Sequence, residues 1–168
     1  MRKIIQAIIA LAGLSALGAC SNLPGTMIVD WAPVDIYITA TDSDGASIIS
    51  PGMPGMSLTF KGETYTVAPE AETRAYAAYM GGLRAQRYEG TADAPVYRLV
   101  FGEIDGAADM DEDIVLSWPD GSTDTIHYHC SNHREWPEPA CRRRWKLNGK
   151  SHDGCIFAFK GKNLPAGE

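Results

Sequence analysis

Apolar and polar side chains alternate along most of the chain after residue 33, as expected for β-strands with one buried face. The segments with this pattern are 34–40, 56–60, 64–67, 83–88, 96–102, 114–118, 123–129, 142–147 and 155–160. Short strands at this close spacing, separated by Gly, Pro and Asp, are typical of an all-β domain. We therefore predict an antiparallel β-sandwich of eight or nine strands.

Two turn signals fix part of the expected pairing. Pro119-Asp120-Gly121 separates two strand segments, and a three-residue loop with Gly121 in the left-handed conformation would place Ile114 opposite Ile126. One buried face of that hairpin would then carry Trp118, Leu116, Ile114, Ile126 and Tyr128. Asn148-Gly149 is the strongest short hairpin signal in the chain. Residues 70–80 are ambiguous, and both a short helix and an irregular crossover fit them.

The first twenty residues have a different character. A basic start is followed by a largely apolar run of sixteen residues, 4–19, that ends in Leu17-Gly18-Ala19-Cys20. Leu followed by two small residues and Cys resembles the bacterial lipobox. That resemblance implies diacylglycerol on the Cys20 thiol, cleavage before Cys20 and acylation of the new amine. The alternatives are an ordinary secretory signal and a membrane anchor, which needs about 20 apolar residues.

The lipobox resemblance also predicts a location. Several acyl chains on one residue give stable anchoring, so the only partner that we assign is membrane lipid, bound through Cys20. Ser21 follows Cys20 and no acid occurs in residues 21–26, which favours the outer membrane and a periplasmic orientation over the cell surface. The expected organisation is a signal peptide (1–19), a lipidated Cys and tether (20–27), a β-sandwich domain (28–162) and a tail (163–168).

Composition narrows the function classes. The 149 residues from Cys20 onward hold 21 acids and thirteen bases, which argues against nucleic acid because its binding depends on Lys and Arg at phosphates. Charge is distributed unevenly. Residues 103–124 hold eight acids and no base, whereas residues 142–162 hold seven bases and one acid. Neighbouring strands of opposite charge would explain this distribution as well as a ligand would.

Three cysteines lie in the expected domain. In an oxidising compartment they allow three single disulfides and leave one thiol over. We favour Cys130–Cys141, because ten residues that include two prolines connect them between strands. Closure of a loop of that size stabilises by roughly 3 kcal/mol in the chain-entropy model. Cys155 alternates with Phe157 and Phe159, so we expect it to be a buried, small apolar residue.

His127 and His129 are two residues apart on one expected strand, so they point to the same side. The proposed hairpin register places Asp113 opposite His127 and Asp111 opposite His129. These four residues are a candidate divalent-metal site. If Cys130 faces Cys141, however, the histidines lie beside Arg142 and Arg144, and acid, histidine and arginine strands form a cross-strand charge ladder. The ladder is the preferred interpretation.

No catalytic motif is present in the sequence, and we predict a non-catalytic domain without a cofactor. The acids at 105, 109, 111 and 113 and the segment 42–45 resemble parts of calcium loops, but they are incomplete and fit solvated turns. Trp136, in the loop 132–139, is a candidate surface for a glycan or a protein partner.

Taken together, the lipobox and the strand pattern resemble the small, single-domain, immunoglobulin-like β-sandwich lipoproteins of Gram-negative gut bacteria. The segments that carry the resemblance are 30–34, 48–56, 60–65, 101–106 and 118–121. The resemblance implies a fold and a location, and it supplies no activity and no site residues. We expect a structural or binding accessory protein of the outer membrane, with a glycan-, protein- or metal-binding module as the alternative.

Overall fold

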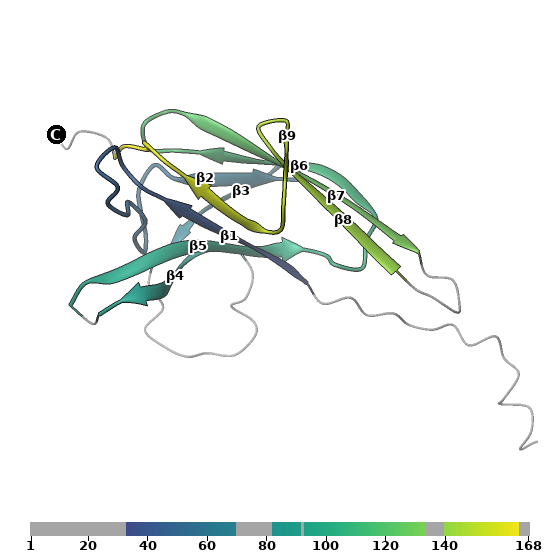
Figure 1. Cartoon of the computed structure of the whole chain (residues 1–168), viewed down its shortest axis with the longest axis horizontal. Coiled ribbons are helices and arrows are strands. Elements are labelled where there is room, and N and C mark those ends of the chain that lie inside the picture. The colour runs from purple at the N-terminus through teal and green to yellow at the C-terminus, as the bar shows by residue number, and fades with distance from the viewer. Residues whose placement is uncertain (1–32, 70–81, 92, 134–139, 165–168) are drawn as a thin grey trace, which may run out of the picture.

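The described residues of the chain form ten β-strands (Figure 1). The computed structural model describes residues 33–69, 82–91, 93–133 and 140–164. The strands are β1 (Val34–Ala40), β2 (Ser57–Phe60), β3 (Glu63–Ala68), β4 (Leu83–Gly90), β5 (Pro95–Ile104), β6 (Met110–Ser117), β7 (Thr123–His133), β8 (Ala140–Leu147), β9 (Lys150–His152) and β10 (Ile156–Phe159). These ranges contain no helix, which confirms the all-β prediction for them, and hence no helix that could span a membrane. The short helix considered near residues 70–80 lies outside them.

The ten strands form one sheet in the order β10-β1-β5-β4-β3-β2-β6-β7-β8-β9. The prediction of a wholly antiparallel arrangement is wrong at two places, since β1 pairs with β10 and β3 pairs with β4 in parallel. Parallel neighbours need a long connection. Residues 69–82 supply it between β3 and β4, and β10 reaches β1 only at the end of the chain.

Aromatic side chains from distant parts of the strand order pack against one another across the core. The Phe60 ring of β2 lies edge-on to Phe101 of β5 with centroids 5.6 Å apart. Trp145 of β8 contacts Phe157 of β10 at 5.7 Å in the same T-shaped manner. Such edge-to-face pairs add stability beyond the buried area. The two ends of the strand order therefore share one hydrophobic core.

Turn geometry explains the pairing of β6 with β7 and of β8 with β9. Gly121 has φ of 80°, and Ile114 faces Ile126 as predicted. Asn148 and Gly149 both have positive φ, 49° and 78°, as a two-residue hairpin turn of type I′ requires. The buried face predicted for the first hairpin is confirmed, since its five side chains are at most 2% exposed.

Asp124 is the buried charged residue of the described core, with 9% of its surface exposed. Its carboxylate accepts hydrogen bonds from the Trp118 indole and the Asn148 amide and pairs with Lys162, each at 2.7 Å. These partners come from the β6–β7 turn, the β8–β9 turn and the segment after β10. A single carboxylate therefore joins three segments at one end of the molecule.

Replacement of Asp124 by Asn should destabilise the fold by about 2–4 kcal/mol at neutral pH, because Lys162 then lacks its counter-charge in a buried site. Burial alone would raise the pKa of Asp124, but the bonds from Lys162, Asn148 and Trp118 outweigh burial and lower the pKa. The stabilisation is therefore complete above the unfolded-state pKa of about 3.9, and it is lost as pH falls through the lower folded-state pKa.

Urea unfolding of both proteins across this pH range measures the effect. Asp44→Asn, in an exposed turn, removes the same charge and should leave stability nearly unchanged. A D124N protein as stable as the original at pH 7 would contradict the assignment.

Candidate functional site

The outward face of β6, β7 and β8 carries three rows of ionisable side chains. Strand alternation turns Asp111 and Asp113 of β6 outward, while their neighbours Met110 and Ile114 are buried. In β7, His127 and His129 alternate in the same way with the buried Tyr128. The cross-strand positions are those predicted, with Asp113 opposite His127 and Asp111 opposite His129.

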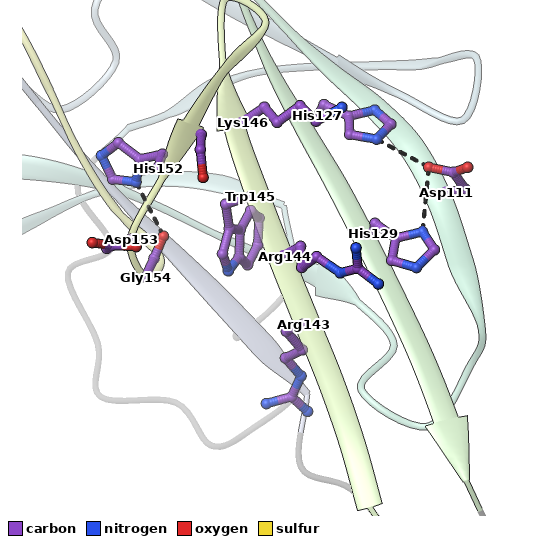
Figure 2. Close-up of a pocket in the computed structure, with 11 residues that line it drawn as sticks. Asp111, His127, His129, Arg143, Arg144, Trp145, Lys146, His152, Asp153 and Gly154 are labelled. Carbon is purple, nitrogen blue, oxygen red and sulfur yellow. Dashed lines mark hydrogen bonds and ion pairs between the residues drawn. The ribbon is translucent and has the colours of Figure 1, made fainter.

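His127 has both ring nitrogens on carboxylates. Its Nδ1 lies 2.9 Å from Asp113 Oδ1, and its Nε2 lies 3.0 Å from Asp111 Oδ1. A neutral imidazole has only one N–H donor, so only the protonated ring satisfies both contacts. The same Asp111 oxygen lies 3.6 Å from His129 Nδ1 (Figure 2). The two aspartates are therefore engaged by the histidines.

The expected pairing of β7 with β8 is wrong by two residues. His129 lies opposite Arg144 and His127 opposite Lys146, whereas Arg142 and Arg144 were predicted at these places. The core explains the shift, because the observed register stacks Trp145 on Tyr128 with ring centroids 4.3 Å apart. The predicted register would have put Arg143 opposite Tyr128. The ladder of acid, histidine and base exists, with Lys146 in place of one arginine.

A groove runs from this face around β8 to the β9–β10 connection. It has a volume of about 440 Å³, and its β8 and β9–β10 walls include Arg143, Arg144, Lys146, His152, Asp153 and Gly154. Figure 2 shows β8 along the middle of the groove, with Arg144 on the side of His129 and Arg143 farther along the strand. Bases exceed acids in this lining, and Asp111 is already held by histidines. The groove suits an anionic ligand.

Sequence reasoning did not assign Arg143, His152 and Asp153 to a site. His152 stacks on Phe157 at 4.5 Å, with its Nδ1 3.3 Å from the Gly154 carbonyl. Its position follows from the Asn148-Gly149 turn, which sets Trp145 opposite His152. That turn was recognised in the sequence, so extending its register by two pairs would have found His152.

The metal hypothesis for His127, His129, Asp111 and Asp113 stays a prediction. The structure brings all four residues together on one face, yet the described residues include no group of three or more His, Cys, Asp or Glu arranged to hold a metal ion. Both His127 nitrogens already contact carboxylates, and Arg144 lies opposite His129. A dication would compete with these cations for the same aspartates.

Three other acids that were considered for calcium accept backbone hydrogen bonds. Asp42 accepts backbone hydrogen bonds from Asp44 and Ala46 at 2.9 and 2.8 Å. Asp105 accepts one from Ala107 at 2.8 Å, and Asp109 accepts one from Asn132 at 2.6 Å. Asp42 and Asp105 therefore stabilise their own turns, as predicted, whereas Asp109, just before β6, is bonded to the backbone of β7.

Cys130 and Cys141 lie close together, although they are not direct cross-strand partners. Cys130 is opposite Arg143 and Cys141 is opposite Asn132, so the two cysteines are diagonal neighbours. Both are thiols here, with Sγ atoms 3.4 Å apart. Burial and the adjacent Cys130 sulfur raise the pKa of Cys141. Cys155 is half-buried against the core beside the buried Phe157. The disulfide stays a prediction that this proximity supports.

Two predicted site residues, Cys20 and Trp136, lie outside the described residues.

Comparisons of this chain with protein-family models, with curated proteins and with solved structures found no match. The functional interpretation therefore depends on the residues themselves.

The Asp113–His127 pair should contribute about 0.2–1 kcal/mol to folding. A double-mutant cycle of Asp113→Asn and His127→Gln, read by urea unfolding, measures it. The coupling energy should be stabilising, because the His127 ring and the Asp113 carboxylate are 2.9 Å apart on adjacent strands. A coupling energy of zero would contradict a contribution of this pair to folding.

The same samples test the metal hypothesis. Elemental analysis of the purified protein should show no stoichiometric zinc if the ladder is the whole role of these residues. Zinc at one equivalent that disappears in His127→Ala would establish a metal site instead.

If Cys130 and Cys141 are bridged in the mature protein, denaturation without reductant should release one thiol from the three cysteines of the domain, and prior reduction should release three. Cys155→Ser should abolish the single thiol that is released without reductant. Three thiols from the oxidised, purified protein would show that no bridge forms.

Proposed function

We propose that this protein is an outer-membrane lipoprotein, anchored through Cys20 and facing the periplasm. Its folded part is proposed to be an immunoglobulin-like β-sandwich that acts as a non-catalytic structural or binding accessory domain. The observation that carries the anchor is the lipobox Leu17-Gly18-Ala19-Cys20 ahead of an all-β body. A glycan-, protein- or divalent-metal-binding module of the cell envelope is the alternative.

Chain length is compatible with this arrangement. β1 begins at Val34, so thirteen residues separate it from Cys20. If fully extended, they would span about 45 Å. The folded part could then stand clear of the lipid headgroups, with its surface available to partners in the periplasm.

Two features support a sandwich with a binding role. The aromatic pairs Phe60–Phe101 and Trp145–Phe157 join opposite parts of the strand order across one core, as two packed sheets would. The groove beside β8 offers arginines and a lysine at the surface.

The anchor is tested by Cys20→Ser. The unmodified protein should sediment with membranes and resist extraction by high salt, whereas C20S should be found in the soluble fraction, because a single change removes every acyl attachment. Cys155→Ser is the matched control and should stay with the membranes. Equal membrane partitioning of C20S and the original chain would contradict lipid anchoring, and protease treatment of intact cells would report surface exposure.

A further inference from the structure

Among the described residues, five of the eight positions of β8 have no second neighbour strand. β9 pairs only with Trp145–Leu147, and the chain then leaves through Asp153 and Gly154 toward β10. Within the described ranges, no strand lies beside residues 140–144 on the side opposite β7. In Figure 1, β7 and β8 extend together beyond β9. An unpaired edge of this kind is a template for another strand.

The turn at Asn148-Gly149 identifies the backbone groups that face the open side. In a two-residue hairpin the flanking residues form a hydrogen-bonded pair, so Leu147 points its N–H and C=O at β9. Because the direction of the main-chain N–H and C=O groups alternates along a strand, Cys141 and Arg143 also point these groups away from β7. The next residue confirms this alternation, since the Asn148 N–H points the other way and donates to the Thr125 carbonyl of β7 at 2.8 Å. Cys141 and Arg143 therefore present donors and acceptors at the open edge.

Charge at this edge is strongly positive. Arg142, Arg143 and Arg144 are consecutive and exposed, and in the described part of the chain none of them forms an ion pair with an acid. The nearby aspartates of β6 are engaged by His127 and His129 instead. Three arginines on each copy would repel a second copy in this position. The edge thus favours an acidic occupant.

We propose that the open edge of β8, residues 140–144, binds an extended acidic segment of a partner protein as an added β-strand. Main-chain bonds to Cys141 and Arg143 supply affinity. Arg142 and Arg144, which share one face of the strand, select carboxylate side chains, whereas the Arg143 side chain lies on the other face beside Cys130 and Cys141. This inference names a partner class for the proposed binding role, and it is independent of the anchor at Cys20.

The probe is a fluorescent eight-residue peptide that alternates glutamate with valine, added to the full-length protein in detergent micelles. Fluorescence anisotropy should show saturable binding. Two control peptides separate the contributions. Lysine in place of glutamate should abolish binding, and N-methylation of alternate peptide bonds should weaken it at least about tenfold, because it removes strand donors without changing charge.

Protein variants locate the site. Arg142→Glu with Arg144→Glu should weaken binding at least about tenfold, whereas Arg87→Glu, an exposed arginine on β4, should leave binding unchanged. Arg143→Pro removes one edge N–H that does not face β7, a position at which edge strands tolerate proline. It should bind less tightly than Arg143→Ala, with both variants retaining the tryptophan fluorescence of the folded protein.

Several outcomes would overturn the proposal. Absence of binding would show that the arginines only protect the edge or that another part of the chain covers it. If the N-methylated peptide bound as tightly as the unmethylated one, main-chain hydrogen bonds would not contribute, and binding would be due to charge attraction alone. Phosphatidylglycerol vesicles bound in place of the peptide would assign the arginines to lipid. If C20S stayed with the membranes, the lipid anchor would be contradicted, but the peptide-binding result would still stand. The two proposals can therefore be contradicted independently.

Discussion

The short connection Asp153–Cys155 is the constraint on which the rest of the structure depends. It joins β9 and β10, the two ends of the strand order, with three residues. The sheet must therefore bring its ends together, which places Phe157 of β10 against Trp145 and His152. The same constraint limits β9 to three residues, because the chain must leave β8 to reach β1. Closure of the core and the open edge of β8 thus have one cause.

The Asp124 cluster holds the opposite end of this arrangement. Lys162 follows β10, and its Nζ contacts both the Asp124 carboxylate and the Ser122 hydroxyl, while its backbone N–H donates to Thr41. The segment that follows β10 is thereby fixed at Lys162 to the β6–β7 turn and to the residue after β1. A buried carboxylate with three polar partners is costly unless all partners are present. The cluster therefore favours one closed arrangement over looser alternatives.

Local signals in the sequence were sufficient wherever a short turn sets the register. Pro119-Asp120-Gly121 placed Asp113 and His127 correctly, and Asn148-Gly149 marked the β8–β9 hairpin. The register of β7 against β8 could not be predicted, because the long connection between them does not fix which residues pair. The stacking of Trp145 on Tyr128 determines this register instead. The two parallel pairings depend on the whole sheet order, which no local pattern encodes. Cys20 and Trp136 lie outside the described residues.

The uneven charge of the sequence has two consequences on one surface. The acids of β6 lie one strand from the histidines of β7 and two strands from β8, so the nearer histidines engage them. Arg142 and Arg144 consequently remain available on an edge whose main-chain groups have no strand partner among the described residues. Either feature alone has an ordinary explanation, since exposed arginines solvate a surface and charged edge strands resist aggregation. Residues 140–144 combine both features. An added acidic strand could therefore form main-chain hydrogen bonds and ion pairs with the same segment.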